Sequence, residues 1–246
     1  MTIDRIVGVN VNCQWPGFAS TRLKAAGWGS RRAVLVAKIK TQKPSVITAQ
    51  ELGAVEAAEL FRDLGGSWRY QRHGLNVCGW HLGTFDDGYE TRQKSLDSFG
   101  QMARTALAVK IRTKDGNRLR LLSSHLAAAA SDLSPADAIV ARARQAQQFV
   151  SWANDDEDDW PTVVGMDANS RQSDNAPGAP RDRLRDYGWR IDAEAVKIGN
   201  LDGDAKRGID LVAVNYGAVL DDVDVFTLGS GSDHDGRRFV LHTTKR

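Results

Sequence analysis

Residues 106–125 read ALAVKIRTKDGNRLRLLSSH and contain two runs in which apolar and polar residues alternate. Alternation of this kind is typical of β-strands with one buried face. The two runs, 106–112 and 118–125, are joined by Lys114-Asp115-Gly116-Asn117. Asp-Gly between two such runs is a strong signal for a hairpin. The stretch therefore predicts two antiparallel strands in the middle of the chain.

Further strands are predicted on both sides of this hairpin, each as a short apolar run bounded by turn residues. These runs are 6–11, 45–50, 68–70, 77–81, 162–166, 211–214, 219–226 and 239–242. Helices are predicted between them: one capped by Ser30, one over 54–64 that ends at Gly65-Gly66, and one from the cap Ser134 to about Ala153. Strands mixed with interspersed helices indicate an α/β protein with mixed sheets covered by helices.

Two long polar stretches, 83–104 and 170–183, show weak periodicity and are predicted to be loops. Long irregular segments in compact domains often carry function, so we expect these two to flank a site and to select its substrate. The sequence contains no fixed-period repeat and no linker. We therefore expect residues 1–246 to form a single domain.

The bulk properties of the chain exclude several classes of protein. The 246 residues carry a formal net charge of +2, which neither requires nor excludes a nucleic-acid partner. No secretory signal and no apolar run of transmembrane length is visible. Only two cysteines are present, Cys13 and Cys78, so a disulfide framework is not expected. We expect a cytoplasmic protein with reduced thiols, no membrane association and no obligate protein partner.

Polar residues that can do chemistry stand where the predicted strands begin or end, the edge of a sheet at which α/β proteins usually place their sites. They are Asn10, Gln50, Glu51, His125, Asp167, Asn169, Asp210, Asp233 and His234. Each alone has an ordinary structural explanation, such as an Asx turn at Asp167-Ala168-Asn169 or a solvated Glu51. Their joint occurrence in this order is the informative signal.

This ordered set resembles the endonuclease/exonuclease/phosphatase superfamily, and the resemblance spans nearly the whole chain, from Asn10 to His234. It implies a four-layer α/β/β/α sandwich, with two packed mixed sheets flanked by helices and the site at one end. It also implies a hydrolase that cleaves phosphate ester bonds with the help of a divalent metal.

The resemblance assigns the metal shell to oxygen ligands, which suit Mg²⁺ or Mn²⁺. Glu51 resembles the principal metal ligand, and Asn10 and Asp233 would complete or support its shell. Asn12 lies in phase with Asn10 on the same strand and is the alternative. Asn10 is preferred here because the family's asparagine directly ends the apolar strand.

The catalytic roles follow from the same resemblance. His234 resembles the histidine that activates water or holds the scissile phosphate, and Asp210 would bond its far ring nitrogen. Asp167 and Asn169 would orient the nucleophile and a phosphoryl oxygen. His125 would contact the phosphate and could protonate the leaving oxygen.

The sequence departs from the family pattern at two places. The family commonly has glycine directly before the Asp167 position, whereas here Met166 stands there and Gly165 comes one residue earlier. The family histidine at the His125 position often has a carboxylate partner, and the sequence does not choose among four candidates. These are Asp86, Asp87, Glu90 and Asp97.

Three functions remain open from the sequence. The first is a nuclease that hydrolyses phosphodiester bonds of DNA or RNA. The second is a phosphoesterase for a small molecule or a lipid headgroup, and the third is an inactive binding module on the same fold. Basic residues beside the two predicted loops could contact a nucleic-acid backbone: Arg104, Arg171, Arg181, Arg183 and Arg185. Trp28, Trp68 and Trp80 could stack on bases, although packing is the better explanation for two of the three.

Overall fold

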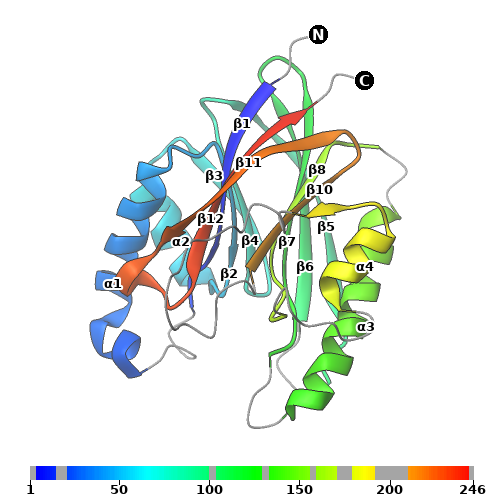
Figure 1. Ribbon diagram of the computed structural model, residues 1–246. Coiled ribbons are helices and arrows are strands. Elements are labelled where there is room, and N and C mark those ends of the chain that lie inside the picture. Colours follow the sequence, from blue (N-terminus) through cyan, green and yellow to red (C-terminus); the bar gives the residue numbers. More distant parts are fainter. Residues whose placement is uncertain are drawn as a thin grey trace.

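The computed structural model describes residues 4–14, 21–99, 104–128, 133–155, 159–170, 179–191 and 210–243. These residues form two six-stranded mixed sheets packed face to face, with two helices covering the outer face of each sheet (Figure 1). The four-layer α/β/β/α sandwich expected from the sequence is confirmed.

The first sheet has the strand order β11-β12-β1-β2-β4-β3. Its strands are β1 (Asp4–Asn12), β2 (Val46–Gln50), β3 (Trp68–His73), β4 (Asn76–His81), β11 (Ala218–Thr227) and β12 (Asp235–Thr243). Strands β1 and β2 are parallel, and every other neighbouring pair is antiparallel.

The second sheet has the order β5-β6-β7-β8-β10-β9. Its strands are β5 (Phe85–Leu96), β6 (Arg104–Thr113), β7 (Arg118–His125), β8 (Thr162–Asp167), β9 (Arg190–Ile191) and β10 (Asp210–Asn215). The predicted hairpin joins β6 to β7. Gly116 makes its turn at a φ of 80°, and the amide of Gly116 donates to the carbonyl of Thr113 at 2.8 Å.

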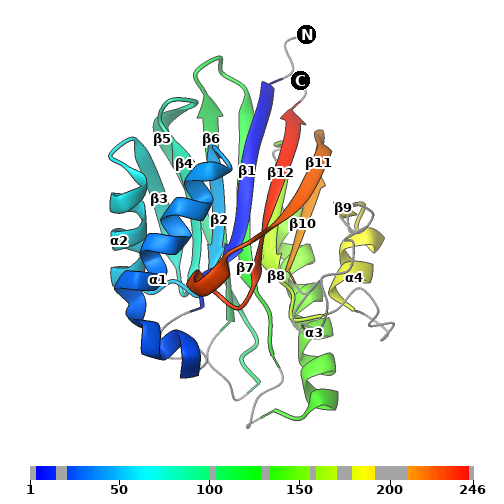
Figure 2. The ribbon, with the colours of Figure 1, turned by 60° about the vertical axis from the view of Figure 1, so that its left-hand side comes forward.

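Helices α1 (Thr21–Thr41) and α2 (Ala54–Leu64) cover the first sheet, whereas α3 (Pro135–Asn154) and α4 (Pro180–Asp186) cover the second (Figures 1 and 2). The predicted cap of α3 is confirmed, because the Ser134 side chain accepts a hydrogen bond from the amide of Asp137. Within the described residues, no helix is long and apolar enough to cross a membrane.

Among the described residues, three large apolar cores hold the layers together, and a fourth, small cluster lies at the start of α3. The central core fills the space between the sheets and includes Trp80, Phe85 and Phe239. The other two large cores lie between each sheet and its helices: one includes Leu35 and Leu60, and the other includes Phe149 and Leu184. Burial on both faces explains why the inner strands are almost continuously apolar. Cys13 and Cys78 are buried and not bonded to each other, as predicted.

Strand register brings the polar strand ends to one edge of the sandwich. Asn12 and Gln50 are register partners at the ends of the parallel strands β1 and β2. His125 and Asp167 are register partners at the ends of the parallel strands β7 and β8, and Asp210 pairs with Asp167 at the start of β10. The carboxyl ends of both parallel pairs therefore meet at the same end of the molecule.

Three predictions about local structure are wrong. Most of the 83–104 stretch is the edge strand β5, whose outer positions are exposed and charged, as edge strands often are. The end of the 170–183 stretch begins α4 with Pro180 at its first turn, and residues 171–178 lie outside the described residues. Ser30 does not cap a helix, because α1 consists of two helical segments separated by a kink at Gly27, which has a φ of 69°, and Ser30 already lies inside the second segment.

Candidate active site

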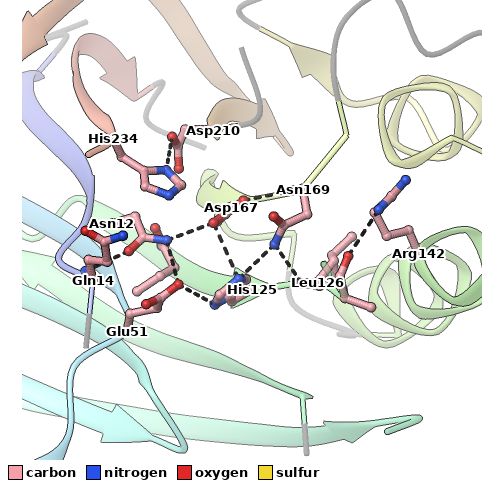
Figure 3. Close-up of polar contacts among 12 residues, drawn as sticks. Asn12, Gln14, Glu51, His125, Leu126, Arg142, Asp167, Asn169, Asp210 and His234 are labelled. Atoms are coloured by element: carbon pink, nitrogen blue, oxygen red, sulfur yellow. Dashed lines mark hydrogen bonds and ion pairs between the residues drawn. The ribbon is translucent and has the colours of Figure 1, made fainter. Parts of the chain in front are cut away.

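Seven polar side chains from strands of both sheets converge at this end of the sandwich (Figure 3). They are Asn12, Glu51, His125, Asp167, Asn169, Asp210 and His234. All but Asn169 are almost fully buried, and Glu51 is the most exposed of those six at 9%. Seven of the nine residues singled out from the sequence as ending or beginning strands lie in or directly beside this cluster, and Asn10 and Gln50 lie beneath it.

Asn12 joins the carboxylates contributed by the two sheets. Its Nδ2 donates to Oε1 of Glu51 at 3.2 Å and to Oδ2 of Asp167 at 2.8 Å. Its Oδ1 accepts a hydrogen bond from the backbone N–H of Gln14 at 2.8 Å, so the orientation of the Asn12 side-chain amide is fixed. Glu51 itself has a φ of 59°, a left-handed conformation that turns the chain out of β2 and toward this amide.

Asn10 lies one layer deeper, between the sheets. Its Oδ1 accepts hydrogen bonds from Thr48 and from Nε2 of Gln50, both at 3.0 Å. Nε2 of Gln50 also reaches Ser123 and the carbonyl of Gly165. A Cβ on Gly165 would stand 1.9 Å from Oγ1 of Thr48, so only glycine allows the sheets to approach this closely. The glycine therefore serves the sheet contact rather than the turn at Asp167.

The contact pattern reverses the sequence-based preference between the two asparagines. Asn12 contacts Glu51 directly, whereas the side-chain oxygen of Asn10 is engaged by Thr48 and Gln50 below the site. The preference for Asn10 rested on its place at the end of the apolar run. The strand instead continues to Asn12, which puts the second asparagine at the rim.

His125 is held by Asn169 and lies between two carboxylates. Nδ2 of Asn169 donates to the carbonyl of Leu126 at 2.9 Å and lies 2.8 Å from Nε2 of His125. Because Nδ2 is a donor, Nε2 of His125 accepts and the ring proton sits on Nδ1. Oε1 of Glu51 is 3.9 Å from that Nδ1, and Oδ2 of Asp167 is 3.4 Å from Nε2.

These contacts answer which carboxylates accompany His125. Glu51 and Asp167 do so, and none of the four sequence candidates is seen in this role. Asp87 pairs with Arg69 and Asp97 with Arg144. Asp167 and Asn169 do form the Asx turn that was the structural alternative, with the Asn169 amide donating to Oδ1 of Asp167 at 2.9 Å. The turn and the contact with His125 coexist.

His234 and Asp210 form a buried pair. Nδ1 of His234 lies 2.8 Å from Oδ2 of Asp210, and both side chains are 6% exposed. The opposite ring nitrogen, Nε2, lies 3.8 Å from Oδ1 of Asp233. The amide of His234 donates to Oγ of Ser232, which fixes the loop that carries the ring. Asp210 therefore holds one ring nitrogen while the other is directed toward the cluster.

Burial and the charges of the cluster shift the pKa of His234, His125 and Asp167. Burial lowers the pKa of His234, but the carboxylates of Asp210, Asp167 and Glu51 outweigh burial and raise it to about 9. Burial and the positive charge of Arg104 hold the pKa of His125 well below its usual value. Burial, together with the charge of Asp210, raises the pKa of Asp167. At neutral pH the metal-free site thus combines the imidazolium of His234 with the neutral imidazole of His125.

In the metal-free protein, we expect NMR titration to give a pKa of about 9 for His234, against about 6.5 for an ordinary histidine. Asp210→Asn should lower this pKa, because the charge of Asp210 makes the largest contribution that raises it. The folded state binds this proton more tightly than the unfolded chain. The pair therefore stabilises the fold fully below about pH 6.5, and the contribution is lost as the pH rises through about 9. An unshifted wild-type value would contradict this account of the pair.

The donor set of the cluster fits a hard divalent cation. Two groups of side chains could each hold an ion, with ligand atoms within 4.8 Å of one another: Glu51 with His125 and Asp167, and Asp167 with Asp210 and His234. Oδ1 of Asp210 is buried, with no hydrogen-bond partner among the described residues. Carboxylate and amide oxygens without thiolates are what Mg²⁺ and Mn²⁺ prefer.

The basic and aromatic residues singled out from the sequence do not gather at the site as a group. Arg183 and Arg185 of α4 pair with Asp186 and Asp182, and Arg181 is buried. Arg104 does lie on the His125 side, and Arg171 is outside the described residues. The three tryptophans pack against the cores: Trp80 is fully buried, Trp28 donates to Glu59, and Trp68 stands edge-on to Phe61.

Gln14 and Arg31 were missed by the sequence analysis. Gln14 bonds Asn12 through its amide, and its side-chain oxygen accepts the amide of Asp233 at 3.4 Å. Arg31 of α1 reaches the backbone on both sides of the site. Neither residue stands at the end of an apolar run, so strand pattern alone gives no signal for them.

No protein-family model matches the chain, and no curated protein matches it in sequence. Solved structures do match over nearly its full length. An endonuclease/exonuclease/phosphatase family protein from Bacteroides thetaiotaomicron has a TM-score of 0.75 at 14% identity, covering 100% of both chains. A mannosyl-6-phosphatase from the same species has a TM-score of 0.72 at 15% identity, covering 96% of this chain and 99% of that one.

TDP2 from D. rerio, solved with a single-strand DNA product, has a TM-score of 0.70 at 14% identity and covers 98% of this chain and 100% of its own. Sequence identities this low indicate a shared fold but not a shared substrate. The chain has the fold of the endonuclease/exonuclease/phosphatase superfamily, as its ordered polar residues indicated.

Proposed function

We propose that this protein is a divalent-metal-dependent phosphoesterase, and specifically a nuclease that hydrolyses phosphodiester bonds of DNA or RNA. The observation that carries the proposal is the buried cluster in which Asn12 joins Glu51 to Asp167 while Asp210 holds His234. A carboxylate cluster with an imidazole held by a second carboxylate is what water attack on a phosphate ester needs.

The proposed metal site is built around Glu51, with Asn12 in the supporting position that was predicted for Asn10 and with Asp233 beside it. A bound divalent cation would neutralise charge on the phosphoryl oxygens. Asn12 fixes the positions of the Glu51 and Asp167 carboxyl groups relative to each other, since its Nδ2 donates to both. The two carboxyl groups are therefore in place before substrate arrives.

His234 is proposed to hold a phosphoryl oxygen through Nε2, because Nδ1 is committed to Asp210. Its imidazolium form, favoured by the surrounding carboxylates, suits a developing negative charge. Asp167 is proposed to orient the attacking water and take its proton, since it is the carboxylate that contacts Asn12, Asn169 and His125. His125 contacts the phosphate from the other side.

A nucleic-acid substrate is favoured by Arg104, whose charge acts on His125 and which begins the strand next to β7. TDP2, which has the same fold, was solved with a single-strand DNA product. A small phosphate ester is the second candidate, because the arginines of α4 are buried or paired with acids of their own helix. The mannosyl-6-phosphatase of the same fold is a precedent for that class.

The test is a metal-dependent assay on single- and double-stranded DNA, RNA, a chromogenic phosphodiester and sugar phosphates. We expect a chelator to abolish turnover and Mg²⁺ or Mn²⁺ to restore it, because the site is built from oxygen ligands. Hydrolysis of oligonucleotides would support the nuclease.

Other outcomes of the same panel separate the alternatives. Turnover of monoesters alone would assign the protein to small phosphate esters, and full activity in chelator would contradict the metal site. No turnover on any substrate, with the fold intact and Mg²⁺ present, would favour an inactive binding module.

A further inference from the structure

We propose that Arg31 is a positioning residue that ties the Asn12 segment to the Asp233–His234 segment and so sets the distance between the metal side and the histidine side of the site. The proposal rests on the proposed function, since it concerns the same cluster. It adds a residue from helix α1, none of whose other described side chains belongs to the cluster.

Arg31 bridges two chain segments that are far apart in sequence. Its Nη2 donates to the carbonyl of Cys13 at 2.6 Å and to that of Gln14 at 2.5 Å. Its Nε donates to the carbonyl of Gly231 at 3.1 Å. The side chain is 1% exposed, so these bonds are shielded from water. One guanidinium therefore fixes the end of β1 against the loop before β12.

Both tied segments lead directly to site residues. Cys13 and Gln14 follow Asn12, and the Gln14 amide donates to Oδ1 of Asn12. Gly231 precedes Ser232, Asp233 and His234, and the Asp233 amide donates to Oε1 of Gln14 at 3.4 Å. A shift of either carbonyl would consequently move Asn12 relative to His234.

The loop that contains Gly231 packs tightly against α1 in addition to its hydrogen bond with Arg31. A Cβ on Gly231 would lie 2.8 Å from Cγ of Leu35 and 3.3 Å from the carbonyl oxygen of Arg31. The loop therefore sits at the closest approach that a residue without a side chain allows. Helix α1 therefore packs against the loop and also positions Arg31 to bond both that loop and the end of β1.

Only arginine fits this position chemically. Its planar guanidinium donates from separate nitrogens to three carbonyls in different directions. The three N–H donors of lysine all lie on one nitrogen, which cannot be within reach of all three carbonyls in this arrangement. A buried charge is an inefficient way to stabilise a fold, because desolvation offsets much of what its contacts contribute. A buried arginine whose three partners all flank the site is therefore better explained by positioning than by stability.

The chain offers a matched control in Arg120. It is also 1% exposed, and it bonds Thr162 and the carbonyl of Ala153, each at 2.9 Å. Thr162 begins β8, whereas Asp167 ends it, so Arg120 lies toward the opposite end of the sheet from the site. Replacing either arginine with lysine keeps the charge and removes the planar guanidinium.

The experiment compares Arg31→Lys with Arg120→Lys in three measurements: thermal stability, the His234 ring signals by NMR, and kcat at saturating metal. We expect both variants to lose stability. Only Arg31→Lys should shift the His234 and Asp233 signals and lower kcat by about 10- to 100-fold, since small displacements of reacting groups carry penalties of this size. Gln14→Leu, which removes only the side-chain contact to Asp233, should shift the same signals.

The outcomes separate this proposal from the proposed function. Unchanged His234 signals and kcat in Arg31→Lys would overturn the positioning role, as would equal changes in Arg120→Lys. If wild-type protein hydrolyses no phosphate ester, the NMR comparison still decides whether Arg31 sets the position of His234. Should Arg31→Lys not fold, Gly231→Ala decides instead, because its Cβ would push the loop away from Leu35 and Arg31; unshifted His234 signals in that variant would overturn the positioning role.

Discussion

Replacing His234 with alanine is expected to lower kcat by roughly 10²–10³-fold, because the imidazolium proposed to stabilise charge on the phosphoryl oxygens is lost. Its Nδ1 is held by Asp210, which leaves Nε2 to contact the substrate. Kinetics at saturating metal and substrate, with the fold checked by circular dichroism, measure the effect. His242→Ala, in the strand β12 that follows His234, is the control, since His242 faces Asp221 and lies outside the cluster.

Asp210→Asn should act through the same step. Without the carboxylate, the ring loses its partner at 2.8 Å and the imidazolium loses its main support. The double variant should then be little slower than His234→Ala alone, as expected for residues that act as a unit. Independent, multiplicative losses would show that the two side chains serve different steps. Near-normal turnover in His234→Ala would move the catalytic role to His125.

Glu51→Gln is expected to raise the Mg²⁺ concentration needed for half-maximal activity by about 10-fold or more, and to lower turnover by roughly 10²-fold. The substitution keeps the size of the side chain but removes the charge that the proposed cation needs. Mg²⁺ titration of activity, together with Mn²⁺ binding measured by electron paramagnetic resonance, gives both numbers.

The control for Glu51 is Glu90→Gln, an exposed glutamate on β5. It removes the same charge without touching the cluster and should leave the Mg²⁺ dependence unchanged. A Glu51→Gln protein with wild-type Mn²⁺ affinity would mean that the ion is held elsewhere, and the group of Asp167, Asp210 and His234 would be the next place to look.

The fold was predictable from the sequence because its inner strands are buried on both faces. Runs such as 162–166 and 211–214 are apolar throughout, and the hairpin at Gly116 carries its own turn signal. The exposed edge strand β5 gave no such signal, because one pairing partner and few buried contacts leave its sequence free to be charged. Helix α4 was missed because its arginines and aspartates resemble a polar loop.

The residues that gather in the cluster could be singled out from the sequence, whereas their contacts could not. Position at or beside the end or start of a strand drew attention to Glu51, His125, Asp167 and Asp210. Which asparagine contacts Glu51 depends on where β1 ends, and which carboxylates face His125 depends on the register between β7 and β8. Neither is encoded in local periodicity.

The order in which the strands of the first sheet join has a consequence for how the chain folds during synthesis. Strand β1 lies in the sheet between β2 and β12, and Asp4 pairs with Thr243, although the other described strands all lie between β1 and β12 in the sequence. A nascent chain therefore carries one open edge of β1 until β12 has been made. Closing so long a loop is entropically slow, and the exposed edge can pair with other chains in the meantime. Yield of active protein should consequently depend on how well that edge is protected before β12 arrives.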